Sequence, residues 1–401
     1  CMSLMPFESA LSHILALAEQ QSMTEIEAVS VELAVGRVLA QDIYAPMDMP
    51  PWPNSAMDGY ALSAEQDLTS PVEVTQKIFA GAAPNKLKSG TCARIFTGAP
   101  LPEGANTVEM QENTKLNDDG RVQFLQAVKR GAFVRPQGGE ASKGELILAT
   151  GQRLGVAELG LLSAFGFVQI NVVRRPVVAV ISTGVELQEP GKPLQVGQIY
   201  NSNRTVLNVW LRQLGCEVRD VGTLPDNPEQ TRQALDALSV SGIDLLLSSG
   251  GVSVGEADCL GQVLQEHGDM CFWKVAIKPG KPVMFGMYGQ TPVLGLPGNP
   301  ASTLVTFGLL ARPYLLRRMG CQSVTPLSLW QPAGFEWPKA GVRREFLRAR
   351  IVSGRVELYS EQSSSVLRSV VWAQGLAILP EGVTVNTGDP IEFIPLSELF
   401  S

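Results

Sequence analysis

Three strand-like runs separated by helical patterns constrain the fold of this chain more than any other feature. The runs are VVAVIS (177–182), CEVRDVG (216–222) and DLLLSSGG (244–251). The first is rich in β-branched residues and fits a strand that is buried on both faces. Strands that alternate with helices form open parallel sheets with helices on both faces. Residues 176–324 are therefore predicted to form an open parallel α/β domain.

The two helices between these strands carry their own start and stop signals. Leucine and tryptophan recur at i, i+3, i+4 and i+7 within 207–214, and Gly215 follows as a helix stop. The second helix opens with NPEQ, in which Asn227 is the cap, Pro228 takes the first helical position and Gln230 completes a capping box. Both helices therefore have defined ends.

The remaining sequence predicts a chain of several domains, because 401 residues exceed what one core holds. Residues 6–20 have helical spacing, and a weaker helical stretch runs into 31–40. Short β-prone runs fill 71–130 and the last 75 or so residues. We expect an N-terminal mixed linking domain (1–45 plus 144–175), an inserted β-rich domain (46–143), the α/β domain (176–324) and a C-terminal β-barrel-like domain (325–401).

Composition excludes several classes of function. The net charge of −7 argues against broad nucleic-acid binding, and no apolar run reaches the roughly 20 residues of a membrane span. The first residues show neither a basic leader nor a small-residue cleavage site, so no secretion signal is expected. Six scattered cysteines fit reduced thiols in a cytoplasm. With two histidines, a histidine-based triad or metal centre is not expected.

Polar and glycine-rich motifs follow each strand of the predicted sheet, at the edge where such sheets bind ligands. Backbone amides of the glycine turns, a helix N-terminus and three lysines favour a phosphate-like anion. Acids at the same edge would repel phosphate unless a divalent cation, typically Mg²⁺, lies between them. The polar residues concerned are Ser182, Thr183, Glu186, Asp226, Ser248, Ser249, Ser253, Glu256, Asp258, Lys274, Lys278 and Lys281.

Each of these motifs has a plainer explanation when taken alone. SSGG and LPGNP also occur as ordinary turns, lysines beside Pro-Gly are usually solvated, and Asp226 could be only the residue before a helix cap. The motifs nevertheless meet at one edge of the sheet. That convergence favours an anion site, but it does not define the reaction.

A second candidate feature is the loop PPWPNSAMDGYAL (51–63). Its prolines stiffen the backbone and Gly59 permits a turn, so the loop is suited to presenting Asn54, Ser55 and Asp58. It could equally be a structural turn in which Tyr60 packs as an aromatic plug.

The ordered motifs of the whole chain resemble the molybdopterin molybdenumtransferase family, which includes MoeA in bacteria and the E domain of gephyrin in animals. The motifs are NSAMDGYA, RIFTGAPLPEG, ISTGVEL, SSGGVSVGEAD, KPGKP and GLPGNPAS. The resemblance implies a homodimer with a shared active site. It also implies insertion of molybdate into adenylylated molybdopterin with release of AMP and a need for Mg²⁺. No permanently bound organic cofactor is expected.

The resemblance also implies residue roles. It assigns acids and lysines to catalysis, together with Asp58 and Thr97 of the mate, and it assigns molybdate to Arg344 and Ser364. The catalytic set is Glu186, Asp226, Asp258, Lys274, Lys278, Asp58 and Thr97, of which Glu186, Asp226 and Asp258 would also hold the metal. The substrate-binding set is Ser182, Thr183, Gly184, Ser248, Ser249, Gly250, Gly251, Ser253, Lys281, Pro297, Gly298, Asn299 and Pro300.

Two departures from the family pattern concern acids. The family usually has Asp where this chain has Pro53, and Gly-Glu-Asp where it has Gly138, Gly139 and Glu140. One hypothesis is that the metal-handling half of the site is weakened, and another is that Asp58 and Glu140 compensate. Restoring Asp at position 53 tests the first hypothesis, because unchanged turnover would contradict it.

Two alternative functions stay open at this point. The chain could transfer an adenylyl group onto molybdopterin, since those enzymes share the α/β domain, or it could be a catalytically weakened scaffold that binds molybdopterin. A molybdopterin adenylyltransferase and apo-molybdoenzymes are the expected protein partners of the leading function. No nucleic acid and no membrane partner is expected.

Overall fold

The computed structural model describes residues 4–252 and 259–400, and the chain forms two compact units. The first unit comprises residues 1–40, 151–156 and 169–401, and the second comprises 41–150 and 157–168. Within the described ranges, none of the helices combines the length and apolar character that a membrane span needs.

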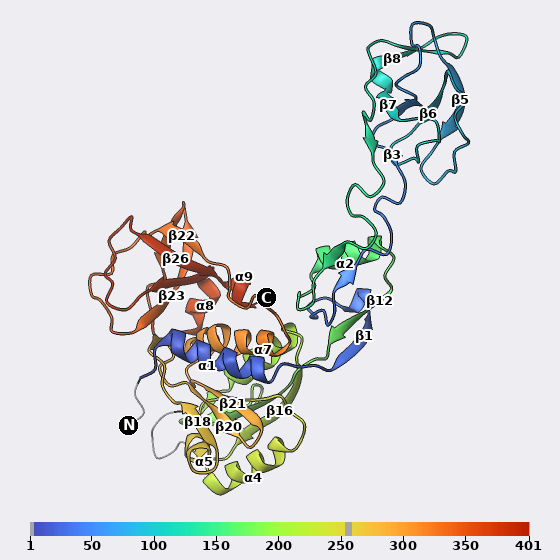
Figure 1. Ribbon diagram of the computed structural model, residues 1–401. Coiled ribbons are helices and arrows are strands. Elements are labelled where there is room, and N and C mark those ends of the chain that lie inside the picture. Colours follow the sequence, from blue (N-terminus) through green and yellow to red (C-terminus); the bar gives the residue numbers. More distant parts are fainter. Residues whose placement is uncertain (1–3, 253–258, 401) are drawn as a thin grey trace. The chain divides into compact units, whose positions relative to one another are not determined.

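A six-stranded sheet forms the centre of the first unit (Figure 1). Its order is β16 (Glu217–Leu224), β13 (Val177–Thr183), β17 (Leu245–Ser249), β21 (Thr291–Leu296), β20 (Met284–Tyr288) and β18 (Asp269–Phe272). The first four strands run parallel to one another, and the three that were predicted from the sequence are among them. At the other edge β20 pairs antiparallel with both β21 and β18, a part of the sheet for which no prediction was made from the sequence. The short turn at Gly289 joins β20 directly to β21 and leaves no room for a crossover helix.

Helices cover both faces of this sheet, as the alternating pattern predicted. One face packs against α1 (Phe7–Gln20), α3 (Ser202–Gln213), α6 (Pro300–Thr306) and α7 (Arg312–Arg318), and the other packs against α4 (Pro228–Ser239) and α5 (Cys259–His267). A π-helical turn, Phe307–Ala311, connects α6 to α7. In α4 the Asn227 side chain accepts a hydrogen bond from Gln230 N at 3.0 Å, which confirms the predicted cap.

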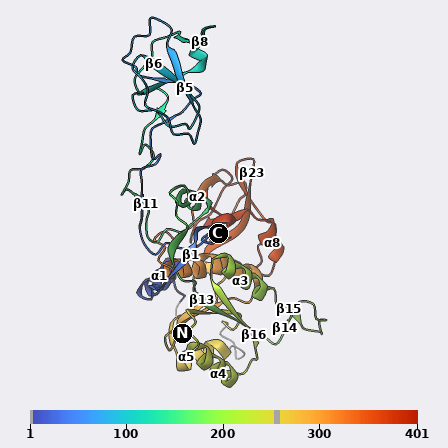
Figure 2. The same ribbon diagram turned by 90° about the vertical axis from the view of Figure 1, so that its right-hand side faces the viewer.

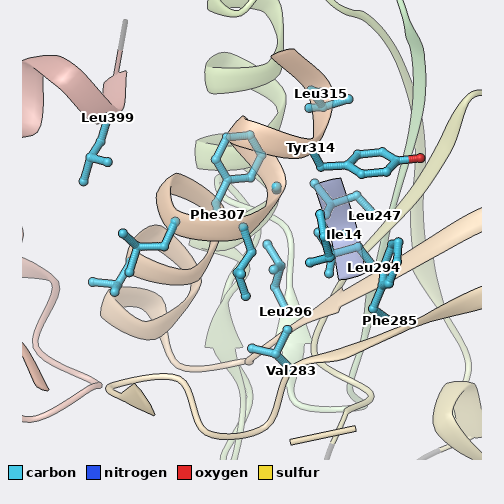
Figure 3. Close-up of a cluster of buried hydrophobic side chains, with 14 of the residues drawn as sticks. Ile14, Leu247, Val283, Phe285, Leu294, Leu296, Phe307, Tyr314, Leu315 and Leu399 are labelled. Carbon is cyan, nitrogen blue, oxygen red and sulfur yellow. The ribbon is translucent and has the colours of Figure 1, made fainter. Parts of the chain in front are cut away.

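The larger core of the first unit lies between the sheet and the helices that include α1 and α7. Figure 3 shows Ile14, Phe307 and Tyr314 from these helical segments beside Leu247 and Leu294 from the sheet. All five side chains are completely or almost completely buried. Burying each large apolar side chain contributes about 1.5–3 kcal/mol, so this layer fixes the helices against the sheet.

The C-terminal part of the first unit is mainly β. Its sheet runs β19 (Ile277–Lys278), β23 (Arg344–Val352), β25 (Gly375–Leu379), β26 (Pro390–Pro395) and β22 (Leu329–Pro332), and β24 (Arg355–Leu358) pairs with β23. Two short helices, α8 (Leu367–Trp372) and α9 (Leu396–Phe400), complete it. Strand β19 comes from the KPGKP segment, so pairing with β23 ties that segment to the C-terminal sheet.

The second unit is built on short strands, as the β-prone runs predicted. Its main sheet has the order β5 (Glu73–Ile78), β6 (Thr91–Ile95), β4 (Gly59–Leu62) and β7 (Thr107–Met110). Two clusters of buried apolar side chains pack in this unit. One includes Ala61, Ile78 and Ile95, and the other includes Tyr60 and Leu62. The smaller strands are β2 (Ile43–Tyr44), β3 (Asn54–Ser55), β8 (Thr114–Leu116), β9 (Val122–Phe124), β10 (Val134–Arg135) and β11 (Leu146–Leu148), and α2 spans Val156–Ala164.

The weaker helix predicted to run into 31–40 is wrong. The structure has strand β1 (Ile26–Ser30) and one 3-10 turn, Val31–Leu33, and β1 pairs antiparallel with β12 (Gln169–Val173). Gly36, at a φ of 75°, interrupts any continuation of the turn. Pairing with a distant strand therefore overrides the local helical spacing.

Candidate active site

A cavity of about 1040 Å³ opens at the carboxyl ends of the central strands, and its lining residues among 4–252 and 259–400 belong to the first unit. Thr183 and Ser249 end β13 and β17, while Asp226 and Pro297 follow β16 and β21. Parallel strands bring their carboxyl ends to one edge, which is where such sheets bind ligands. The edge predicted from the sequence is therefore the site of a large cavity.

Most of the residues predicted for the site line this cavity. They come from the four segments at the ends of β13, β16, β17 and β21, from the β19 segment, and from a serine-rich loop near the C-terminus. The predicted residues that line the cavity are Thr183, Gly184, Glu186, Asp226, Ser249, Gly250, Gly251, Lys278, Lys281, Pro297, Gly298, Asn299, Pro300 and Ser364.

Four predicted residues of the first unit are described but do not line the cavity. Ser182 and Ser248 are completely buried beneath it, and the Ser248 hydroxyl donates to Gly250 O at 2.8 Å. The Lys274 carbonyl accepts from Met5 N at 2.9 Å. Arg344 forms ion pairs with Glu8 and Glu381.

The other predicted site residues lie elsewhere in the chain. Ser253, Glu256 and Asp258 fall outside the described residues. Asp58 and Thr97 belong to the second unit, where both the backbone N–H and the hydroxyl of Thr97 donate to Asp58 Oδ1 at 2.8 Å. These two hydrogen bonds, the backbone one first, lower the pKa of Asp58, so the carboxylate is held in one orientation as an anion.

The SSGG turn requires its glycines for steric reasons. Gly250 and Gly251 have φ values of 84° and 69°, in the left-handed region. A Cβ on Gly250 would lie 2.9 Å from Thr183 O, and one on Gly251 would lie 2.7 Å from Thr183 Oγ1. The turn therefore packs against the end of β13 so closely that a side chain at either position would displace it.

One buried asparagine joins the two glycine-rich turns. Asn203, which is 8% exposed, donates from Nδ2 to Ser249 Oγ at 2.8 Å and to Gly298 O at 2.7 Å. Neither bond depends on a ligand. The SSGG and LPGNP turns are therefore held at a fixed separation across the floor of the cavity.

Positive charge gathers on the side of the cavity formed by β19 and the start of β23. Lys278 and Glu345 are register partners, and Lys278 Nζ lies 3.0 Å from Glu345 Oε2 in an ion pair without hydrogen-bond geometry. Arg343, which also lines the cavity, donates from Nη1 to Ile277 O at 3.1 Å. With Lys281 nearby in the lining, this side of the cavity suits an oxyanion.

The serine-rich loop, residues 362–365, is supported from below by a buried arginine. Arg348 is fully buried and donates from Nη2 to Ser363 O at 3.2 Å, and burial lowers its pKa to about 10. Gln362 bonds the Arg348 backbone in both directions at 2.9 Å. On the cavity side, Ser364 Oγ accepts from Asn299 Nδ2 at 2.9 Å, so its own hydroxyl proton can be offered to a ligand.

Two exposed carboxylates, Glu186 and Asp226, line the cavity and fit a magnesium ion that is bound mainly by phosphate and water. A Cβ on Gly184 would lie 2.6 Å from Glu186 Oε2, which shows that this carboxylate folds back over the turn after β13. Among the described residues no three His, Cys, Asp or Glu side chains form a metal cluster. The donors therefore suit a cation that arrives with a phosphorylated ligand.

Several lining residues were missed by the sequence reasoning, namely Tyr200, Asn201, Asn203, Arg343 and Gln362. The NSN triplet at the start of α3 was a signal for the two asparagines, because Asn at a helix start is often a cap or a ligand contact. The choice between Arg343 and Arg344 had no such signal. It depends on the register of β19 with β23, which aligns Ile277 with Arg344.

Three family descriptions match successive parts of the chain. Residues 5–166 match the MoeA N-terminal region (domain I and II), 179–317 match a probable molybdopterin binding domain, and 331–396 match the MoeA C-terminal region (domain IV). These ranges together take in most of the sequence.

Whole-length relatives agree with these matches. A protein of Haemophilus influenzae named molybdopterin molybdenumtransferase is 39% identical over 387 residues, which cover 94% of this chain and 95% of the relative. A protein of the same name from Synechococcus elongatus is 35% identical, with 97% and 99% covered. A crystal structure of the molybdopterin biosynthesis MoeA protein from Pyrococcus horikoshii is 33% identical, covers 100% of both chains and has a TM-score of 0.78. The chain therefore belongs to the molybdopterin molybdenumtransferase (MoeA) family.

Proposed function

We propose that this protein is a molybdopterin molybdenumtransferase that inserts molybdate into adenylylated molybdopterin during molybdenum cofactor biosynthesis, with release of AMP. The observation that carries this proposal is the cavity itself. It joins two glycine-rich turns to a cationic side in one space of about 1040 Å³, large enough for a ligand with both a phosphate group and a bulky ring system. The names of the full-length relatives favour this reaction over adenylyl transfer.

The residues of the cationic side have complementary tasks toward molybdate, a doubly charged oxyanion. Lys278 and Lys281 supply positive charge, and Arg343 adds a planar set of donors. Ser364 offers its hydroxyl from a loop that Arg348 holds in place. We assign Arg343 to molybdate in place of Arg344, because Arg344 pairs with Glu8 and Glu381.

The turns after β17 and β21 would bind the phosphate portion through backbone amides. Gly250 and Gly251 bring the backbone close to the ligand, and Asn203 fixes both turns before the ligand arrives. Preorganised donors of this kind stabilise charge that develops when a phosphoanhydride bond is cleaved. This arrangement fits cleavage of the pyrophosphate linkage.

Glu186 and Asp226 are the described residues that would hold Mg²⁺ together with the substrate phosphates. When bound, the ion would supply positive charge at the linkage that is cleaved. Molybdate would bind at the other side of the cavity, where the lysines and Arg343 supply the positive charge.

We further propose that the enzyme is a cytoplasmic homodimer in which Asp58 and Thr97 of each subunit act at the cavity of its mate. The support is that these residues belong to the second unit, whereas the described residues that line the cavity belong to the first unit. The described cysteines are all free thiols, as expected in a reducing compartment. A molybdopterin adenylyltransferase would supply the substrate, and apo-molybdoenzymes would receive the product.

The proposal is tested by incubating the purified protein with adenylylated molybdopterin, molybdate and Mg²⁺ and measuring AMP. We expect AMP release that depends on molybdate and Mg²⁺ and is lost in Lys278→Ala. Tight binding of the substrate with no AMP release would contradict the proposal and favour a scaffold role. Consumption of ATP with free molybdopterin would instead indicate adenylyl transfer.

A further inference from the structure

A buried carboxylate lies behind the cationic side of the cavity. Glu345 is 6% exposed and is not among the described residues that line the cavity, whereas its register partner Lys278 lines it. Glu345 is the second residue of β23, the long strand labelled in Figure 2. Burying a carboxylate is costly, and a neutral side chain of similar volume is often at least as stable in such a place. The charge at this position therefore points to a task in the site.

Both oxygens of this carboxylate have a defined neighbour. A Cβ on Gly341 would lie 2.7 Å from Glu345 Oε1, so the backbone at Gly341 packs against this oxygen. Glu345 Oε2 accepts no hydrogen bond from residues 4–252 and 259–400, and Lys278 Nζ lies 3.0 Å from it. The carboxylate is thus held between Gly341 and Lys278, and the ammonium of Lys278 compensates its charge.

The backbone that carries Lys278 is fixed independently of the lysine side chain. Arg344 N donates to Ala276 O at 3.1 Å, and Arg343 Nη1 donates to Ile277 O at 3.1 Å. Both bonds tie the short strand β19 to the start of β23. The part of Lys278 that stays free to move is its four-carbon stem, and the buried carboxylate is placed to hold the end of that stem.

Lys281 provides a comparison within the same segment. It lines the cavity and is exposed, as Lys278 is, but it forms no ion pair with any residue that the structure describes. A lysine without a partner samples many rotamers and loses that freedom when it binds an anion. Lys278 has lost much of this freedom already in the free protein, because Glu345 holds its ammonium.

We propose that Glu345 is a positioning residue for molybdate binding, which holds the Lys278 ammonium at the cavity before the oxyanion arrives. Glu345 does not touch the oxyanion and acts through Lys278. The proposal rests on the proposed function, in which Lys278 binds molybdate.

The carboxylate also repels an oxyanion, and this effect opposes positioning. The two effects differ in their dependence on Lys278, because repulsion acts on molybdate directly whereas positioning requires the lysine. A double-mutant cycle separates them. It measures the effect of Glu345→Gln, which keeps the shape of the side chain and removes its charge, once in the wild type and once in Lys278→Ala.

Titration calorimetry of the full chain with molybdate gives the affinities. We expect Glu345→Gln to weaken molybdate binding by about three- to tenfold in the chain that has Lys278, the effect of immobilising one long side chain on binding. In Lys278→Ala the same change should not weaken binding further, since there is no ammonium to hold. Glu345→Asp retains the charge and should recover most of the affinity, because the flexible lysine stem can follow the shorter side chain.

Glu357→Gln is the matched control. Glu357 pairs with Arg350 in the same sheet and is not among the described residues that line the cavity, so this variant should bind molybdate like the wild type. Thermal unfolding of each variant shows that the fold is retained.

A second measurement needs no variant that has to fold. In crystals of the wild-type protein, the Lys278 side chain should be ordered beside Glu345 and should have lower B-factors than the side chain of Lys281. A Lys278 side chain as disordered as that of Lys281 would contradict the positioning role.

Three outcomes of the titrations overturn the positioning role of Glu345. They are unchanged or tighter molybdate binding in Glu345→Gln, an equal loss with and without Lys278, and a Glu345→Asp variant that binds as weakly as Glu345→Gln. Molybdate-dependent AMP release is measured on the same samples. AMP release by a wild-type protein in which the two residues show no coupling overturns the positioning role alone. Coupling in a chain that releases no AMP overturns the proposed function and leaves the positioning role standing.

Discussion

At the scale of single residues, alanine substitutions at two glycines test whether the SSGG turn has room for a side chain. Gly250 and Gly242 both have positive φ, at 84° and 75°, but only at Gly250 would an added Cβ lie within 3 Å of another atom, Thr183 O. An alanine in this region costs about 1–2 kcal/mol by itself. We expect Gly242→Ala to lower the thermal midpoint slightly, and Gly250→Ala to lower it further and to abolish substrate binding. Equal midpoints for the two variants would show that the close approach to Thr183 is not limiting.

The neighbouring arginines at the start of β23 give a second residue-scale prediction. Arg343 lines the cavity, so Arg343→Met should weaken molybdate binding by about tenfold or more, the effect of losing a charge-assisted hydrogen bond worth roughly 1.5–3 kcal/mol. Arg344→Met loses ion pairs with exposed partners and a cation–π contact with Phe7, none of them at the cavity, and should bind molybdate normally. Titration calorimetry with molybdate measures both. If only Arg344→Met binds molybdate more weakly, the assignment of molybdate to Arg344 that was made from the sequence would be correct.

These residues also show what sequence can predict at this scale. Gly250, Gly251 and Asn227 have roles that their own backbone chemistry requires, so the local motif was sufficient. Arg343 has a role that depends on which direction its side chain takes after distant segments pair. That direction is set by the β19–β23 register.

At the scale of elements, the serine-rich loop depends on the buried Arg348. Arg348→Met removes the donors to Ser363 O and Ser369 Oγ, at 3.2 and 3.1 Å. We expect faster amide hydrogen exchange in 362–365 and weaker molybdate binding, because Ser364 loses its fixed position. Arg355→Met, an exposed arginine of the same sheet, should change neither property.

The pH dependence of this effect follows from the direction of the shift. Burial disfavours the charged guanidinium and lowers the pKa of Arg348 to about 10. The resulting loss of folding stability is constant at pH values below about 10. It decreases only as the pH rises above about 10 and the folded state loses the proton. The difference between Arg348→Met and wild type should therefore be constant from pH 6 to 9. A difference that changes across this range would show that another titrating group governs the loop.

Periodicity predicted the regular elements of the α/β region well, and it failed where distant segments pair. The strands β13, β16 and β17 and the helices α1, α3 and α4 follow their local patterns. The antiparallel strand β20 and the two-residue strand β19 do not, because each is defined by its partner. The local motif was sufficient to predict Lys278 as a site residue, but it gave no sign that strand β19 pairs with the C-terminal sheet and brings that sheet to the cavity.

At the scale of the whole molecule, the proposed exchange of residues between subunits predicts complementation. Asp58→Ala and Lys278→Ala should each be inactive as pure proteins, since each site would lack one contribution. After unfolding and refolding together, half of the dimers would be mixed and each would regain one intact site, giving about a quarter of wild-type activity. Wild-type protein refolded in the same way is the control. Two inactive variants whose mixture stays inactive would contradict a shared site.

The central claim is that this protein delivers molybdenum to the dithiolene of molybdopterin. The most direct measurement is reactivation of an apo-molybdoenzyme after incubation of the purified protein with adenylylated molybdopterin, Mg²⁺ and molybdate. The account predicts activity that requires both the protein and molybdate and is strongly reduced in Lys278→Ala and Arg343→Met. An apo-enzyme that stays inactive although the protein binds the adenylylated substrate would contradict it.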